Sequence, residues 1–84
     1  MKHYATPEFW YHYRAIPAEV RSLADNAFRF LKMDPRHPGI HLKKVGEYWS
    51  ARIGLHYRAA GIGVQGGISW FWIGTHAEYD ILLR

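Results

Sequence analysis

Hydrophobic residues recur every three or four positions in the first half of the chain and alternate with polar residues in the second half. Over residues 17–33 the helical spacing predicts one amphipathic helix, with a buried stripe formed by Val20, Leu23, Ala24, Ala27, Phe28 and Leu31. Thr6-Pro7-Glu8 is typical of a helix start and predicts a shorter helix over residues 7–14. Ile16-Pro17 separates the two helices, because the residue before a proline is pushed out of helical geometry.

Strand patterns fill residues 40–73. Within residues 48–54, Trp49, Ala51 and Ile53 share one face, while the polar side chains share the other. Further strands are predicted at residues 40–45, 56–60 and 68–73, and the last of these is apolar on both faces, which favours an interior position.

The connections between these elements follow from glycine and proline. Residues 34–39, with two prolines and a glycine, predict a loop after the long helix, and Gly46-Glu47 predicts a hairpin turn. The four glycines of residues 61–67 predict a flexible hairpin loop. One or two helical turns over residues 77–83 are expected to return Ile81 and Leu82 to the core.

These elements predict an α+β fold in which an N-terminal helical hairpin packs on a twisted antiparallel sheet of three or four strands. A chain of 84 residues has material for one hydrophobic core, so a single domain over residues 1–84 is expected.

Composition excludes several classes of protein. The chain has no cysteine, which rules out disulfides and thiolate metal sites. Its longest apolar run is too short to span a bilayer, and its first ten residues lack the apolar core of a signal peptide, so a cytoplasmic protein without membrane association is expected. The six histidines show no ligand spacing on a predicted helix, and no metal or other cofactor is expected.

Positive charge is concentrated in the middle of the chain. The net charge of the whole sequence is +4, but residues 29–58 hold seven Lys and Arg against two acidic residues, a net charge of +5. Such a concentration indicates a partner that carries phosphates or acidic side chains. The alternative is that the extra cations only keep a small domain in solution.

Two stretches, LKKVGEYWSARIGLHYRAAG and WFWIGTHAEYDILL, resemble the RelE/ParE superfamily of bacterial toxin–antitoxin toxins. In that family a helical hairpin precedes a glycine hairpin, an arginine-bearing strand pair and a hydrophobic strand that ends near a His or Arg and a Tyr. The resemblance covers roughly residues 17–84 and rests on Leu42, Lys43, Tyr48, Arg52, Ile53, Gly54, Tyr57, Arg58, Ile73, Gly74, His76 and Tyr79. Family members usually begin with a strand, for which only residues 1–5 are available here.

The resemblance implies a toxin of a type II system that cleaves messenger RNA on the ribosome and thereby inhibits translation. It implies catalytic roles for four residues: Arg58 would grip the scissile phosphate, Arg52 would assist, His76 would transfer a proton, and Tyr79 would orient or stack on the RNA. RNA-binding roles fall to Lys43, Lys44, Tyr57 and Arg36. The implied partners are the ribosome, messenger RNA and a cognate acidic antitoxin.

Each of these residues also has a purely structural interpretation. Arg58 could pair with Glu78 or Glu47, His76 could cap the end of a strand, and Tyr79 could pack the last helical turns. Lys43 and Lys44 could form a basic sheet edge that deters aggregation. Two other functions also remain open at this point: a ParE-like toxin that binds DNA gyrase without catalysis, and a non-toxic domain that binds only an antitoxin or RNA.

Overall fold

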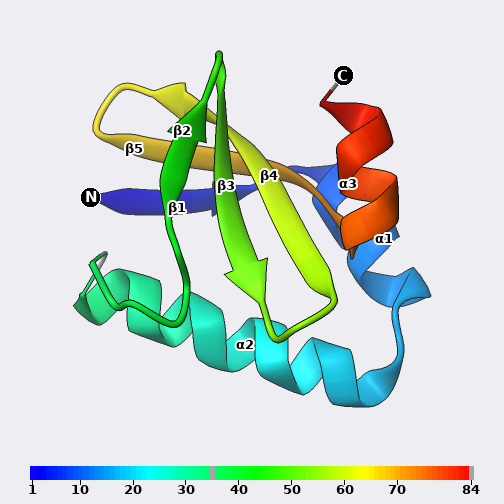
Figure 1. The fold of residues 1–84 in the computed structure, drawn as a ribbon. Helices are drawn as coiled ribbons and strands as arrows, with labels where there is room; N and C mark the ends of the chain where they lie inside the picture. The colour runs from blue at the N-terminus through cyan, green and yellow to red at the C-terminus, as the bar shows by residue number, and fades with distance from the viewer. Residues whose placement is uncertain (35, 84) are drawn as a thin grey trace.

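Five strands form one mixed sheet, with α2 beneath it and with α1 and α3 at the end where β4 begins and β5 ends (Figure 1). The computed structural model describes residues 1–34 and 36–83, so Pro35 of the predicted loop lies outside the described residues. The elements in chain order are β1 (Lys2–Ala5), α1 (Pro7–Ala15), α2 (Ala18–Met33), β2 (Lys43–Val45), β3 (Tyr48–Ile53), β4 (Tyr57–Val64), β5 (Gly67–Thr75) and α3 (His76–Leu82).

The α+β class is confirmed and β2 to β5 are antiparallel as predicted, but the sheet has five strands rather than three or four, and the fifth, β1, is parallel to its neighbour. The strand order is β1-β5-β4-β3-β2, and β1 runs parallel to β5, with His3 opposite Ile68. The stub at residues 1–5 is therefore a full edge strand. Each residue of β1 pairs with a residue 65 positions later in the sequence, and no local sequence pattern predicts such a pairing.

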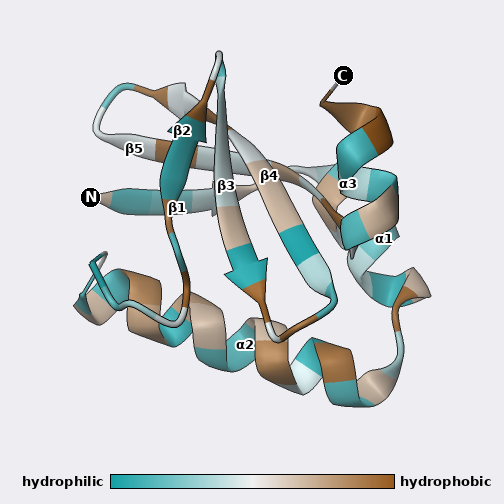
Figure 2. Ribbon diagram, viewed as in Figure 1, coloured by the Kyte–Doolittle hydropathy of each residue, from teal (hydrophilic) through white to brown (hydrophobic). Residues whose placement is uncertain are grey.

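The main core lies between the sheet and the first two helices, on what we call the inner face. Hydrophobic and hydrophilic residues alternate along α2 (Figure 2), and Val20, Ala24, Ala27 and Leu31 are buried as predicted. Leu23, expected in the same stripe, is 47% exposed, because the stripe is narrower than the sequence suggested. No helix within residues 1–34 and 36–83 is both long and apolar enough to cross a membrane.

A second, smaller cluster lies on the opposite face of the sheet, the outer face, where α3 packs. It consists of Ala60, Trp72 and Tyr79, with Phe71 and Leu83 packed against it. The register of β5 shifts between Ala60 and Gly61, which leaves Phe71 as an extra residue in the strand. This bulge explains the unbroken apolar run of β5, because Phe71 and Trp72 both belong to the outer cluster.

Two predicted strand boundaries are wrong for identifiable reasons. The strand expected at residues 40–45 begins only at Lys43, since His41 has a left-handed backbone with a φ of 50°. The flexible loop expected at residues 61–67 is instead mostly strand, because β4 continues to Val64. A Cβ atom at Gly61 would lie 2.7 Å from Ile68 Cγ2. The glycine is therefore needed inside the strand, where it leaves space for the Ile68 side chain, and it does not mark a loop.

The last helix begins at His76, one residue earlier than predicted. Thr75 caps it, accepting a hydrogen bond from the Glu78 backbone N–H at 3.1 Å, while Glu78 accepts one from the Thr75 N–H at 2.9 Å. Ile81 and Leu82 do not return to the core, because they are 65% and 41% exposed. Tyr79 and Leu83 face the sheet instead.

Candidate functional site

Two arginines stand directly opposite each other on the outer face, Arg52 on β3 and Arg58 on β4. Arg52 Nε donates to the Gly54 carbonyl at 3.0 Å, and Arg58 Nη1 donates to the Tyr57 carbonyl at 3.2 Å. Neither guanidinium forms an ion pair with an acidic residue in the described parts of the chain, Glu78 and Glu47 included. Like charges on opposed strand positions are destabilising, so this pair favours an anionic ligand over a purely structural role.

Lys43 extends the positive charge toward the edge of the sheet. It pairs with Ser50, which has the same face as Arg52 on β3, so Lys43 belongs to the outer face as well. Lys44 pairs with Trp49 and therefore belongs to the inner face at the sheet edge. Arg36 lies in the loop after α2. Of the four cations predicted to bind RNA or phosphate on the strands, the sheet thus gathers three on one face.

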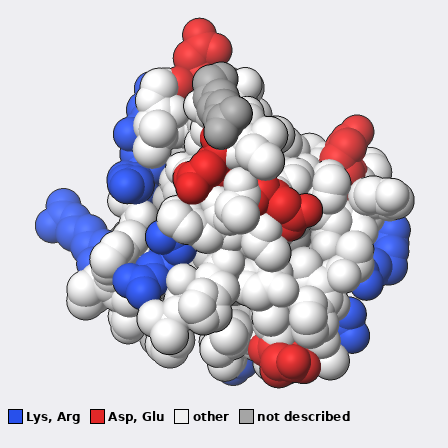
Figure 3. Space-filling model, turned by 45° about the vertical axis from the view of Figure 1, so that its right-hand side comes forward, with Lys and Arg blue, Asp and Glu red and all other residues white. Residues whose placement is uncertain are grey.

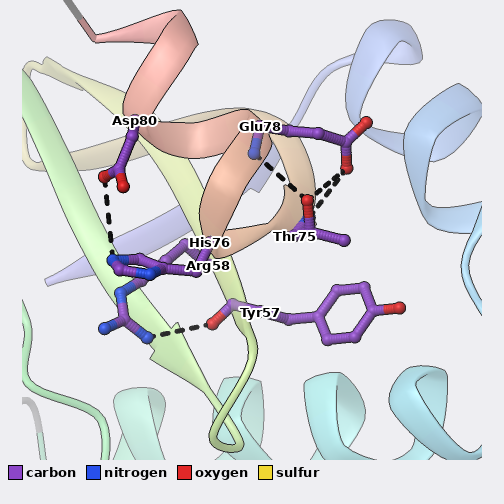
Figure 4. A network of polar contacts seen from close by, with 6 residues as sticks. All are labelled: Tyr57, Arg58, Thr75, His76, Glu78 and Asp80. Carbon is purple, nitrogen blue, oxygen red and sulfur yellow. Dashed lines mark hydrogen bonds and ion pairs between the residues drawn. The ribbon is translucent and has the colours of Figure 1, made fainter.

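An imidazole lies at the same end of the sheet. Arg58 is opposite Gly74, two residues before His76, and in the view of Figure 4 the His76 and Arg58 side chains extend to the same side, with Asp80 next to the imidazole. His76 Nε2 is 3.7 Å from Asp80 Oδ1, and both side chains are more than half exposed. The His76 backbone N–H donates to the His56 carbonyl at 2.8 Å, and this hydrogen bond fixes the start of α3 against the turn before β4.

The two predicted tyrosines occupy different places. Tyr79 is buried at 9% exposure, and its ring stacks on His76 with the centroids 6.4 Å apart and the planes at 18°. It therefore supports the imidazole from the core side. Tyr57 is part of the inner face, where it packs against the main core, and in Figure 4 its ring extends away from Arg58.

Asp80 was not predicted from the sequence. The signal was present, because Asp80 follows His76 at the i, i+4 spacing that brings two side chains together on a helix. The prediction began the helix at residue 77 and so left His76 outside it. The capping box that moves the start to His76 also creates the His76–Asp80 pair.

The charge distribution places acids between two groups of cations. Figure 3 shows Lys and Arg side chains mainly along the left edge of that view and a smaller group at the right edge, with acidic side chains between them. Among the acids, Glu78 has a lowered pKa, first because of the Thr75 backbone N–H and next because of the Thr75 hydroxyl.

Comparison with known proteins gives one likeness of fold. A chain of the RelB–RelE antitoxin–toxin complex from Methanococcus jannaschii is similar in structure with a TM-score of 0.75, covering 96% of this chain and 99% of that chain, at 12% sequence identity. No family model matches the sequence, and no curated protein matches it. At this identity the likeness concerns the fold: the chain folds like a chain of a toxin–antitoxin complex.

Proposed function

We propose that this protein is the toxin of a type II toxin–antitoxin system and that it cleaves messenger RNA on the ribosome, which stops translation. The observation that carries the proposal is the opposed Arg52–Arg58 pair, with His76 two residues beyond Gly74, the residue opposite Arg58. The fold of a chain from an antitoxin–toxin complex supports a place in such a system. The cations on the outer face support the toxin role rather than the antitoxin role. The antitoxin is the partner that would cover this basic face, and it would need negative charge to do so.

The reaction requires proton transfer and charge stabilisation. The ribose 2′-hydroxyl loses its proton and attacks the adjacent phosphorus, a cyclic phosphate forms, and the 5′-oxygen leaves with a proton. Arg58 binds two oxygens of the phosphate, and Arg52 supplies the second fixed charge as the phosphorane gains negative charge. His76 transfers the proton, since an imidazole ring has one nitrogen that can accept a proton and another that can donate one.

The remaining residues position this set. The Asp80 carboxylate, with Oδ1 3.7 Å from His76 Nε2, favours an imidazole that carries a proton. Tyr79 supports the ring from below, and its burial makes it a positioning residue rather than one that stacks on RNA. Lys43, Lys44 and Arg36 are exposed and contribute long-range attraction to the RNA backbone.

The proposed role includes a partner, a small acidic antitoxin with a helix that covers the basic outer face. Charge complementarity would speed their association and silence the toxin, because the partner would occupy the place of the RNA phosphates. Co-expression with the protein encoded by the neighbouring gene tests this point. If that neighbour never co-purifies with the chain, the partner proposal fails.

Primer extension on a messenger RNA translated by purified ribosomes tests the proposed activity. The native protein is expected to produce ribosome-dependent cuts, which Arg58→Ala and His76→Ala should each reduce by roughly 100-fold or more, as the loss of a charge-stabilising or proton-transfer group does. Asp80→Asn should reduce cutting less, because the imidazole remains. Arg14→Ala is the matched control, since Arg14 is an exposed cation on α1.

The outcomes separate the candidate functions. Cuts that persist in folded Arg58→Ala and His76→Ala proteins would refute the assigned site. An absence of cuts with the native protein would refute the nuclease, and a DNA supercoiling assay would then test gyrase inhibition.

A further inference from the structure

A second concave site lies on the other side of α3 from the arginine pair. Beyond residue 70, β5 no longer pairs with β1, and α1 packs across that open edge. Between the last turn of α1, the end of β5 and the first turn of α3 lies a cavity of about 220 Å³. It is lined by His12, Ala15, Ile16, Pro17, Tyr57, Trp72, Ile73, Gly74, Thr75 and Glu78.

The walls of this cavity carry polar groups that the fold leaves unused. Within residues 1–34 and 36–83, no hydrogen bond is formed by the Trp72 indole N–H, the Tyr57 hydroxyl, the His12 ring or Glu78 Oε2. Only the other oxygen of Glu78, Oε1, is engaged, by the Thr75 N–H and hydroxyl at 2.9 and 2.8 Å. These two bonds fix the carboxylate and leave Oε2 as a free acceptor.

Aromatic rings supply the rest of the surface. The His12 ring lies 6.1 Å from the Trp72 ring, centroid to centroid, and Tyr57 forms another wall. Aromatic rings and polar side chains thus share the lining, unlike that of the apolar core, so the cavity suits a flat group that stacks and also forms hydrogen bonds. Its volume lies below the roughly 300 to 1,000 Å³ of sites for drug-sized ligands, and it matches a single nucleobase.

We propose that this cavity binds one base of single-stranded RNA and prefers bases that carry an exocyclic amino group. The free Glu78 Oε2 accepts a hydrogen bond from an amino N–H of cytosine, adenine or guanine. Uracil has carbonyl oxygens on both sides of its single ring N–H, and one of them would face the carboxylate. The cavity thus disfavours uracil.

The position of the cavity connects it with the arginine pair. Tyr57 and Thr75, which line it, pair with each other and directly precede Arg58 and His76 in the chain. Figure 4 shows Tyr57 and Glu78 extending to one side of this strand end, and Arg58 and His76 to the other. An RNA strand that passes over this end of the sheet can place a phosphate on the arginines and a nearby base in the cavity. In this form the inference rests on the proposed function and adds base selection to it.

Binding of uncleavable RNA tests the inference separately from catalysis. Short fluorescent 2′-O-methyl oligocytidylate and oligouridylate differ in the amino group but not in charge or ring size, and the methyl group blocks attack by the 2′-oxygen. By fluorescence anisotropy, the native protein should bind oligocytidylate on the order of tenfold more tightly. Glu78→Gln should abolish or invert that ratio, because the glutamine can still cap α3 while its amide N–H donates to a carbonyl.

Two further variants separate base recognition from general effects. Glu47→Gln removes the same charge in the β2–β3 turn, at the opposite end of the sheet, and should leave the ratio unchanged. His12→Ala removes a stacking wall and should weaken both oligonucleotides severalfold at an unchanged ratio.

Equal binding of the two oligonucleotides by the native protein would overturn the inference, and so would a ratio that Glu78→Gln leaves intact. Ribosomal cuts together with equal binding would refute the base site but not the nuclease. A cytidine preference that Glu78→Gln abolishes, found without any ribosomal cuts, would support the base site and refute the nuclease.

Discussion

The stability of the β1 strand should depend on the protonation of His3. Its ring stacks on Trp70 and contacts the edge of Phe28, and its Nδ1 accepts a hydrogen bond from Trp70 Nε1 at 3.1 Å. Its Nε2 is buried without a partner among the described residues. Burial lowers the pKa of His3, and the N-terminal ammonium and Lys32 lower it further.

The sign of the pH dependence follows from this direction. The unfolded chain takes up the His3 proton near pH 6.5, whereas the folded protein resists it, so the unfolded state binds more protons below that pH. The contribution of neutral His3 to the free energy of unfolding is complete above pH 6.5. It is lost as the pH falls through the lowered pKa of His3 in the folded protein. One proton gives at most about 1.4 kcal/mol per pH unit. Water screens this half-buried ring, so we expect about 0.5 kcal/mol between pH 6.5 and 5.5.

Urea unfolding followed by tryptophan fluorescence measures this loss at pH 7.5, 6.5 and 5.5. His3→Asn keeps an acceptor close to the position of Nδ1 and cannot be protonated. The part of the pH dependence of the free energy of unfolding that His3 causes should therefore vanish in this variant. His56→Asn is the matched control, an exposed histidine in the turn before β4, and should keep the native slope. If His3→Asn and the native protein lose equal stability between pH 6.5 and 5.5, the reasoning is wrong.

Three further predictions concern stability and are read from urea midpoints. Gly74→Ala should lower the free energy of unfolding by about 1 to 3 kcal/mol, because its Cβ would lie 2.5 Å from the Trp72 ring. Gly63→Ala is the matched comparison: its Cβ meets only a 3.4 Å contact, so the loss should be less than half as large. Thr75→Ala should cost about 1 kcal/mol by removing the cap of α3, and Thr75→Ser should restore most of it. Gly67→Ala should detach β1, since the new Cβ would lie 1.9 Å from the Lys2 carbonyl oxygen; unchanged midpoints would contradict the packing described at these glycines.

Elements with a strong local period were predictable from the sequence. The α2 helix, the β3 strand and the interior β5 strand all form where their patterns indicated. The alternation in β3 also indicated that Arg52 turns away from the core, and the register confirms that it does so opposite Arg58. Periodicity succeeds here because the burial of one face determines these elements.

Features that depend on distant contacts were not predictable in this way. The pairing of β1 with β5 joins residues that share no local pattern, and the strand character of Gly61 depends on the crowding from Ile68 and Trp70 across the sheet. The His76–Asp80 pair required the correct first residue of α3, and helix ends are harder to locate than helix interiors. The cavity near His12 joins the two ends of the chain, which only the fold brings together.

The parallel pairing of β1 with β5 also affects when this protein can fold during its synthesis. Lys2 leaves the ribosome long before Gly67, its partner, so β1 has no strand to join until β5 has emerged. The inner core likewise needs Ile68, Trp70 and Ile73 of β5 to close over the helices. Contacts of such long sequence separation form late, because the chain must first close a large loop. A nascent chain that stops before β5 is thus an open sheet, and the end of β5 that leads into His76 can take its place opposite Arg58 only once β5 has emerged.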